Sequence, residues 1–74
     1  MKIEIKLYRL SYEDGEYCVG TENEVINNHN LWVKQSGRFE LNEIDDNLAK
    51  TLQDLKEHWT VEQFYTVVLE VNKE

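Results

Sequence analysis

The most constraining feature of this 74-residue chain is a stripe of apolar residues at helical spacing, set between segments with the period of a β-strand. The stripe consists of Ile44, Leu48, Leu52, Leu55 and Trp59. Steps of three and four residues place these side chains on one face of an α-helix. Asn42 suits the N-cap position, and the acids that follow it favour the positive end of the helix dipole. The sequence therefore predicts one amphipathic helix over residues 43–58.

The pattern of residues 2–21 predicts a β-hairpin. Ile3, Ile5 and Leu7 alternate with charged residues, which is typical of a half-buried strand. The apolar phase then moves to the even positions from Tyr8 onward, which indicates a change of face or a bulge. Asp14-Gly15 favours a two-residue type I′ turn, which pairs Tyr12 with Tyr17. On this register Tyr8, Tyr12 and Tyr17 share one face of the hairpin.

The middle of the chain is less regular. Thr21 and Glu24 match a capping box and would allow one or two helical turns, but the asparagines that follow favour turns, and we expect a loop over residues 21–30. A second hairpin is predicted from Leu31–Gln35 and Arg38–Leu41 about Ser36-Gly37. Phe64–Val71 is rich in β-branched and aromatic residues and predicts a central strand.

These elements predict a single α+β domain over residues 1–74. We expect a mixed, mainly antiparallel sheet of four to five strands with one amphipathic helix packed on a face, in the order ββ-ββ-α-β. The last strand would then run parallel to the fourth through a right-handed crossover. A chain of this length leaves room for one small core only.

The charge of the chain limits its partners. Fifteen acidic residues oppose eight basic ones, and the net charge of −7 argues against direct binding to nucleic acid or to an anionic membrane. A basic protein surface is the natural partner. The single Cys18 cannot form an internal disulfide, and the alternating N-terminus does not resemble a signal peptide, so we expect a cytoplasmic protein.

Catalytic and metal-binding patterns are weak in this sequence. Cys18 lies in a predicted strand, opposite Ser11, and His29 and His58 do not stand in a nucleophile motif with it. The acids near residue 43 lack the pattern of a calcium loop, and the three glycines do not form a phosphate-binding loop. We therefore expect no enzyme activity, no cofactor and no metal.

The acidic residues are the best candidates for partner binding. The predicted contact set combines acids of the Asp14-Gly15 turn, acids near the start of the predicted helix, and two tyrosines. Its members are Asp14, Glu16, Glu40, Glu43, Asp45, Asp46, Tyr12 and Tyr17. A globule of this length should have a radius of gyration of about 11 Å and a width near ~30 Å, over which duplex DNA carries about 17 charges. The net charge of −7 is too small to imitate a duplex, so imitation would require the fifteen acids to gather on one side of the protein. The alternative is that they simply keep a small domain soluble.

The tyrosines suggest a different kind of association. A single helix cannot cover both sides of the predicted sheet, so the tyrosine-bearing face stays open to a partner subunit or to a second copy of the chain. A small structural or regulatory subunit, or a homodimer, is therefore the alternative function.

The chain also resembles the small acidic anti-CRISPR and related anti-defence proteins of bacterial phages. The resemblance rests on size, charge, a composition typical of AT-rich genomes, and the fragments Asp14–Tyr17, Thr21–Glu24 and Glu62–Tyr65. This class shares no diagnostic motif, and no residue role is carried over. The resemblance implies a non-enzymatic inhibitor that occupies a basic, nucleic-acid-binding surface of a host effector such as a CRISPR nuclease, in the host cytoplasm.

Overall fold

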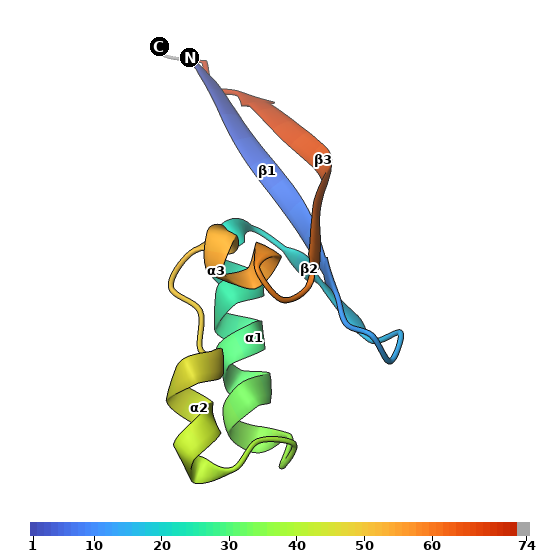
Figure 1. Ribbon diagram of the computed structural model, residues 1–74. Coiled ribbons are helices and arrows are strands. Elements are labelled where there is room, and N and C mark those ends of the chain that lie inside the picture. The colour runs from blue at the N-terminus through green and yellow to red at the C-terminus, as the bar shows by residue number, and fades with distance from the viewer. Residues whose placement is uncertain (73–74) are drawn as a thin grey trace.

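The computed structural model describes residues 1–72 and has a three-stranded antiparallel sheet with three helices (Figure 1). The elements are β1 (Lys2–Ser11), β2 (Tyr17–Gly20), α1 (Glu22–Gln35), α2 (Leu41–Asn47), α3 (Leu52–Lys56) and β3 (Thr60–Glu70). The α+β class and the antiparallel pairing agree with the prediction. The predicted strand number and element order are wrong. The sheet runs β2-β1-β3, so β1 is central, and β3 lies at an edge and antiparallel to its neighbour.

The first hairpin forms, but with a different turn. Only Gly15 in the turn has a positive φ, of 88°, whereas a type I′ turn needs two such residues. Tyr12 N–H donates to the Glu16 carbonyl over 2.8 Å, and the three residues between them form the loop. The strand register is therefore shifted by one residue from the prediction.

This shift moves Tyr17 to the other face of the sheet. Tyr17 pairs with Ser11, and Cys18, predicted opposite Ser11, pairs with Leu10. Because directly paired residues share a face, Tyr17 lies on the opposite side of the sheet from Tyr12. The three tyrosines predicted to share one face are therefore divided between the two faces of the sheet.

The middle of the chain is helical. The structure has α1 where a loop at 21–30 and a strand at 31–35 were predicted, and the second hairpin is absent from the described residues. Thr21 and Glu24 do form the capping box that the sequence indicated. Val25, Ile26, His29 and Val33 are buried along one side of α1, at steps of one, three and four residues. This helical spacing outweighs the local turn preference of the asparagines.

The predicted helix over residues 43–58 is interrupted. Leu48 is extended, with φ −73° and ψ 148°, and Thr51 caps a new helix by accepting a hydrogen bond from Asp54 N–H over 3.2 Å. Asn42 is not the N-cap of α2, because Glu40 occupies that position. The apolar stripe is therefore divided: Ile44 lies in α2, Leu48 in the non-helical segment 48–51, Leu52 and Leu55 in α3, and Trp59 in the turn after α3.

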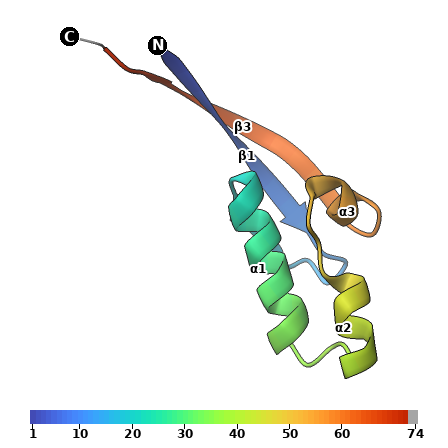
Figure 2. The same cartoon turned by 90° about the vertical axis from the view of Figure 1, so that its left-hand side faces the viewer.

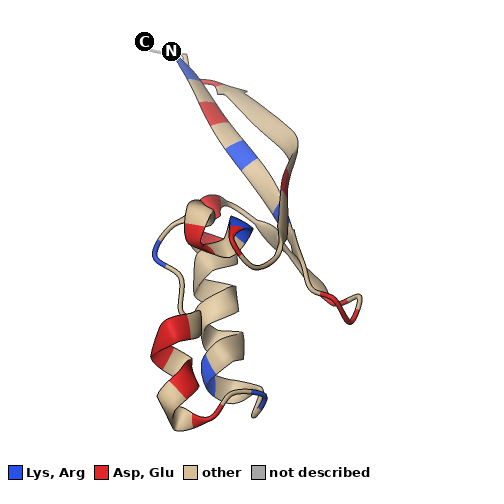
Figure 3. Ribbon diagram, in the orientation of Figure 1, with Lys and Arg blue, Asp and Glu red and all other residues tan. Residues whose placement is uncertain are grey.

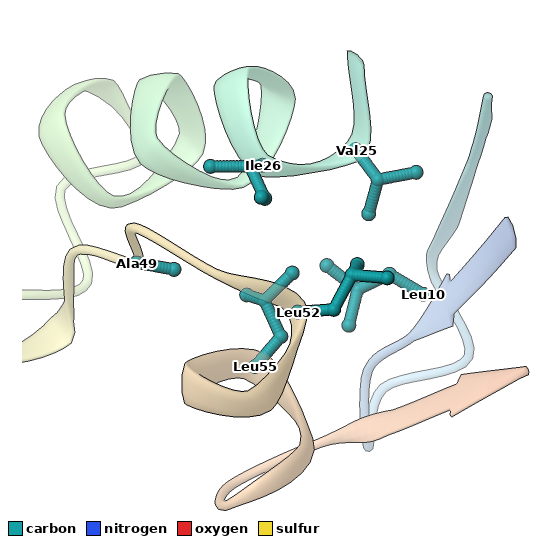
Figure 4. Close-up of a cluster of buried hydrophobic side chains, with 6 residues drawn as sticks. All are labelled: Leu10, Val25, Ile26, Ala49, Leu52 and Leu55. Atoms are coloured by element: carbon teal, nitrogen blue, oxygen red, sulfur yellow. The ribbon is translucent and has the colours of Figure 1, made fainter. Parts of the chain in front are cut away.

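The hydrophobic core lies where the helices meet one face of the sheet. Its buried members are Leu10, Val25, Ile26, Ala49, Leu52 and Leu55 (Figure 4). Cys18 and Val61 pack against this cluster from the strands on either side of β1. The core therefore involves only the part of the sheet near β2.

The rest of β1 and β3 projects away from the helices as a two-stranded ribbon (Figure 2). In this ribbon, β1 residues 2–7 pair with β3 residues 65–70. A register shift between Leu7 and Tyr8 marks a bulge in β3, at the point where the apolar phase of β1 changes face. The ribbon makes the molecule 54 × 22 × 18 Å, with a radius of gyration of 15.0 Å rather than the 11 Å of a compact chain.

Candidate functional site

Charge is unevenly distributed along the long axis of the molecule. In the ribbon, Lys2 and Lys6 balance Glu4 and Glu70. Residues 8–64, which we call the acidic body, hold five basic and twelve acidic residues and therefore carry the whole net charge of −7 (Figure 3). The structure thus separates a neutral projection from an acidic body.

Asp14, at the hairpin tip, is bound within the body. Its Oδ1 accepts a hydrogen bond from Glu16 N–H over 3.0 Å, and its Oδ2 lies 2.8 Å from Arg38 Nη1. The backbone N–H of Glu16, and then the Arg38 guanidinium, hold the pKa of this carboxyl below its usual value. Asp14 is therefore ionised and largely compensated by Arg38.

Three of the predicted contact residues line one hollow beside the hairpin tip. Tyr12, Glu16 and Tyr17 surround a hollow of about 390 Å³. We call this the aromatic hollow; Cys18, Asn28 and Trp32 also line it. Its mostly apolar walls and its carboxylate suit the aliphatic stem and charged head of a lysine or arginine.

Arginines of the chain itself already lie on aromatic rings of this hollow. The Arg9 guanidinium carbon is 4.3 Å from the centre of the Tyr17 ring, and that of Arg38 is 5.6 Å from a Trp32 ring. Both distances lie within the range of cation–π attraction. Each of these two rings therefore makes a cation–π contact within the chain.

The other predicted acids lie on or beside α2. Glu40 N–H donates to the Glu43 side chain over 3.2 Å, so this pair helps to start the helix. Asp45 and Asp46 are exposed. Figure 3 shows the acids of α2 and those of the hairpin tip on different sides of α1. The structure does not gather the predicted contact set on one face.

Tyr12 belongs to a cluster of aromatic rings that the sequence did not reveal. Its hydroxyl lies 2.8 Å from His29 Nδ1, and its ring stacks on Trp32 with centroids 4.4 Å apart. His29 is fully buried, and its Nε2 donates to the Asn47 carbonyl over 2.8 Å. Nδ1 of the neutral imidazole therefore accepts a hydrogen bond from the Tyr12 hydroxyl. Helical spacing from Val25 and Ile26 was the signal that could have placed His29 inside.

Neither Cys18 nor the potential metal ligands of the chain form a reactive site in the described residues. Burial raises the pKa of the Cys18 thiol, so little thiolate is present at neutral pH. Within residues 1–72, His, Cys, Asp and Glu side chains do not form a group of three that would hold a metal ion. None of the described helices has the length and apolar character needed to cross a membrane.

Comparison of the chain with protein-family models, with curated proteins and with solved structures found no match. The charge distribution and the aromatic hollow are therefore the features that bear on function.

Proposed function

We propose that this protein is a non-enzymatic binding protein whose acidic body docks on a basic surface of a partner protein. The observation that supports it best is the confinement of the net charge of −7 to residues 8–64, beside a neutral ribbon. A body with a large net negative charge attracts a basic partner and speeds its encounter.

The aromatic hollow is the proposed centre of this contact. A lysine or arginine of the partner enters between Tyr17 and Trp32, and its charged head meets the Glu16 carboxylate. This contact combines cation–π attraction with a charge-assisted hydrogen bond. The acids of α2 form a second, outlying contact that steers the partner.

A nucleic-acid-binding protein is the proposed class of partner, because such proteins expose basic surfaces. A host defence nuclease such as a CRISPR effector would fit, and the protein would then act as an inhibitor. We propose docking rather than imitation of a whole duplex, because the acids lie on two sides of α1 (Figure 3).

Binding of a defined basic probe tests the proposal. The probe is a fluorescent peptide of about nine arginines, followed by anisotropy at about 50 and 300 mM salt. We expect weaker binding at high salt and a further loss of roughly fivefold, about 1 kcal/mol, in Glu16→Gln. Glu22→Gln is the matched control, because it removes the same charge from α1 outside the hollow.

Two results would contradict the proposal. Equal affinity at both salt concentrations would rule out electrostatic docking. Equal losses in Glu16→Gln and Glu22→Gln would show that the peptide senses net charge alone, and the aromatic hollow would not be the contact. A pull-down from host lysate at the same two salt concentrations then identifies the natural partner.

A further inference from the structure

The ribbon has one face made entirely of apolar and aromatic side chains. The pairs Ile3–Leu69, Ile5–Val67 and Leu7–Tyr65 lie directly opposite each other on β1 and β3. Because paired residues share a face, these six side chains form one surface, which we call the apolar ribbon face. On β2, Tyr17 and Val19 lie on the same side of the sheet, but Arg9 pairs with Val19 and lies on the Tyr17 ring, so the uncharged face ends at Leu7 and Tyr65.

The charged residues of the ribbon all lie on its other face. Lys2 pairs with Glu70, and Glu4 and Lys6 pair with Val68 and Thr66. The apolar ribbon face therefore carries no charge between residues 2–7 and 65–70.

The helices leave this apolar face uncovered. They pack on the opposite side of the sheet, where Leu10, Cys18 and Val61 join the core. Figures 1 and 2 both show the ribbon extending beyond the helices. Ile3 is 39% exposed and Leu69 47% exposed. A two-stranded ribbon is only marginally stable in water by itself, so this face requires a cover.

We infer that a second copy of this chain covers the apolar ribbon face. The two ribbons pack face to face and antiparallel about a two-fold axis near Ile5 and Val67, as the sheets of a sandwich do. Each copy then contributes its own apolar ribbon face, and because neither face is charged, no charge is buried between them.

The charge distribution favours this arrangement. Each acidic body carries −7, and the two would repel each other if they were adjacent. An antiparallel pair of ribbons puts the bodies at opposite ends of an assembly longer than the 54 Å of one copy. Charges separated by much more than the Debye length of about 8 Å are largely screened at physiological salt.

The available area is sufficient for a weak dimer. A tyrosine can bury about 200 Å². Tyr65, at 60% exposure, therefore offers roughly 120 Å². With the five aliphatic residues of the face, each copy offers on the order of 400 Å², and the pair buries about 800 Å², which is the size of a weak, transient interface. We expect a dissociation constant in the micromolar range.

Adjacent residues on opposite faces of β3 provide a sharp test. Leu69 lies on the apolar ribbon face and Val68 on the charged face, and both are about half exposed. Sedimentation equilibrium over about 5–500 μM should show the mass rising from 8.9 kDa toward twice that value. Leu69→Lys should raise the dissociation constant at least tenfold, whereas Val68→Lys should leave it nearly unchanged. Circular dichroism checks that both variants fold, and Ile3→Lys repeats the test from β1.

The outcomes separate this inference from the proposed docking function. Dimerisation should not weaken between about 50 and 500 mM salt, because the face is uncharged, whereas docking through the acidic body should. A mass of 8.9 kDa at every concentration would overturn the inference, and so would equal effects of Leu69→Lys and Val68→Lys, which indicate pairing through a strand edge. Either result leaves the arginine-peptide test of the aromatic hollow unaffected.

Discussion

The side chain of Asn30 is joined to the backbone of Ala49 by two hydrogen bonds. Nδ2 donates to the Ala49 carbonyl over 2.8 Å, and Ala49 N–H donates to Oδ1 over 2.7 Å. This pair holds the extended segment 48–51 against α1, at the point where the apolar stripe predicted an unbroken helix. The amide supplies the partners that helical backbone bonds would otherwise have provided.

Replacing Asn30 should therefore destabilise the fold strongly. Asn30→Ala removes both bonds and leaves two backbone groups of the buried Ala49 unpaired, so we expect the free energy of unfolding to fall by about 2–3 kcal/mol in urea titrations. Asn27→Ala, at an exposed position of the same helix, is the control and should change stability by less than about 0.5 kcal/mol. Equal effects of the two substitutions would contradict this role of Asn30.

The Tyr12 hydroxyl should stabilise the fold through its hydrogen bond to His29. Tyr12→Phe leaves the buried Nδ1 of His29 without a donor, and we expect a loss of about 1–2 kcal/mol in the free energy of unfolding. Tyr17→Phe removes the same group from an exposed ring and should be nearly neutral. Chemical denaturation followed by tryptophan fluorescence measures both, and a neutral Tyr12→Phe would show that the hydrogen bond contributes nothing.

Stability should fall as the pH decreases below neutrality because of His29. Burial lowers the pKa of this imidazole, whereas in the unfolded chain it titrates near pH 6.5. Between the two pKa values only the unfolded chain binds the proton, so the free energy of unfolding decreases as pH falls from about 6.5 toward the lower folded pKa. Urea unfolding between about pH 7.5 and 5 should show this slope.

His29→Gln should flatten that slope, and His58→Gln, at an exposed position, should retain it. An unchanged slope in His29→Gln would assign the effect to another group. The carboxyls of Asp14, Glu24 and Asp54 also have lowered pKa values, each mainly because a backbone N–H donates to it. Their contribution is lost only as pH falls from about 4 toward their lower folded pKa values, which is outside the range of about pH 5 to 7.5 of this measurement.

Gly15 should resist substitution for conformational reasons alone. Its φ is 88°, and an added Cβ would meet no atom within 4 Å, so Gly15→Ala carries strain without a clash. We expect a loss of about 1–2 kcal/mol in the free energy of unfolding, and a smaller loss for Gly15→Asn, because asparagine tolerates positive φ. Thermal unfolding monitored by circular dichroism compares the two; a more stable alanine variant would contradict the turn geometry.

The candidate site was only partly predictable. The acids of the hairpin tip and of α2 are exposed, as their types suggest. Tyr12 and Tyr17 lie on opposite faces of the sheet, although both line the aromatic hollow. A one-residue change in the hairpin decided this, because successive side chains of a strand point to opposite sides. Glycine-containing turns of two and three residues have similar local signals, so the register depended on packing against the helices.

The sequence by itself determined the features that neighbouring residues control. These are the hairpin turn at Gly15, the capping box of Thr21 and Glu24, the change of apolar phase after Leu7, and the excess of acids. Each depends on contacts over a few residues, which local chemistry decides. Tertiary structure alone decided the rest. Asn30 and Thr51 divided the second helical segment, packing of Val25 and His29 made α1 a helix, and pairing with β1 placed β3 at the edge. These outcomes depend on residues distant in the sequence, and helical spacing is the same whether a stripe lies on one helix or on two.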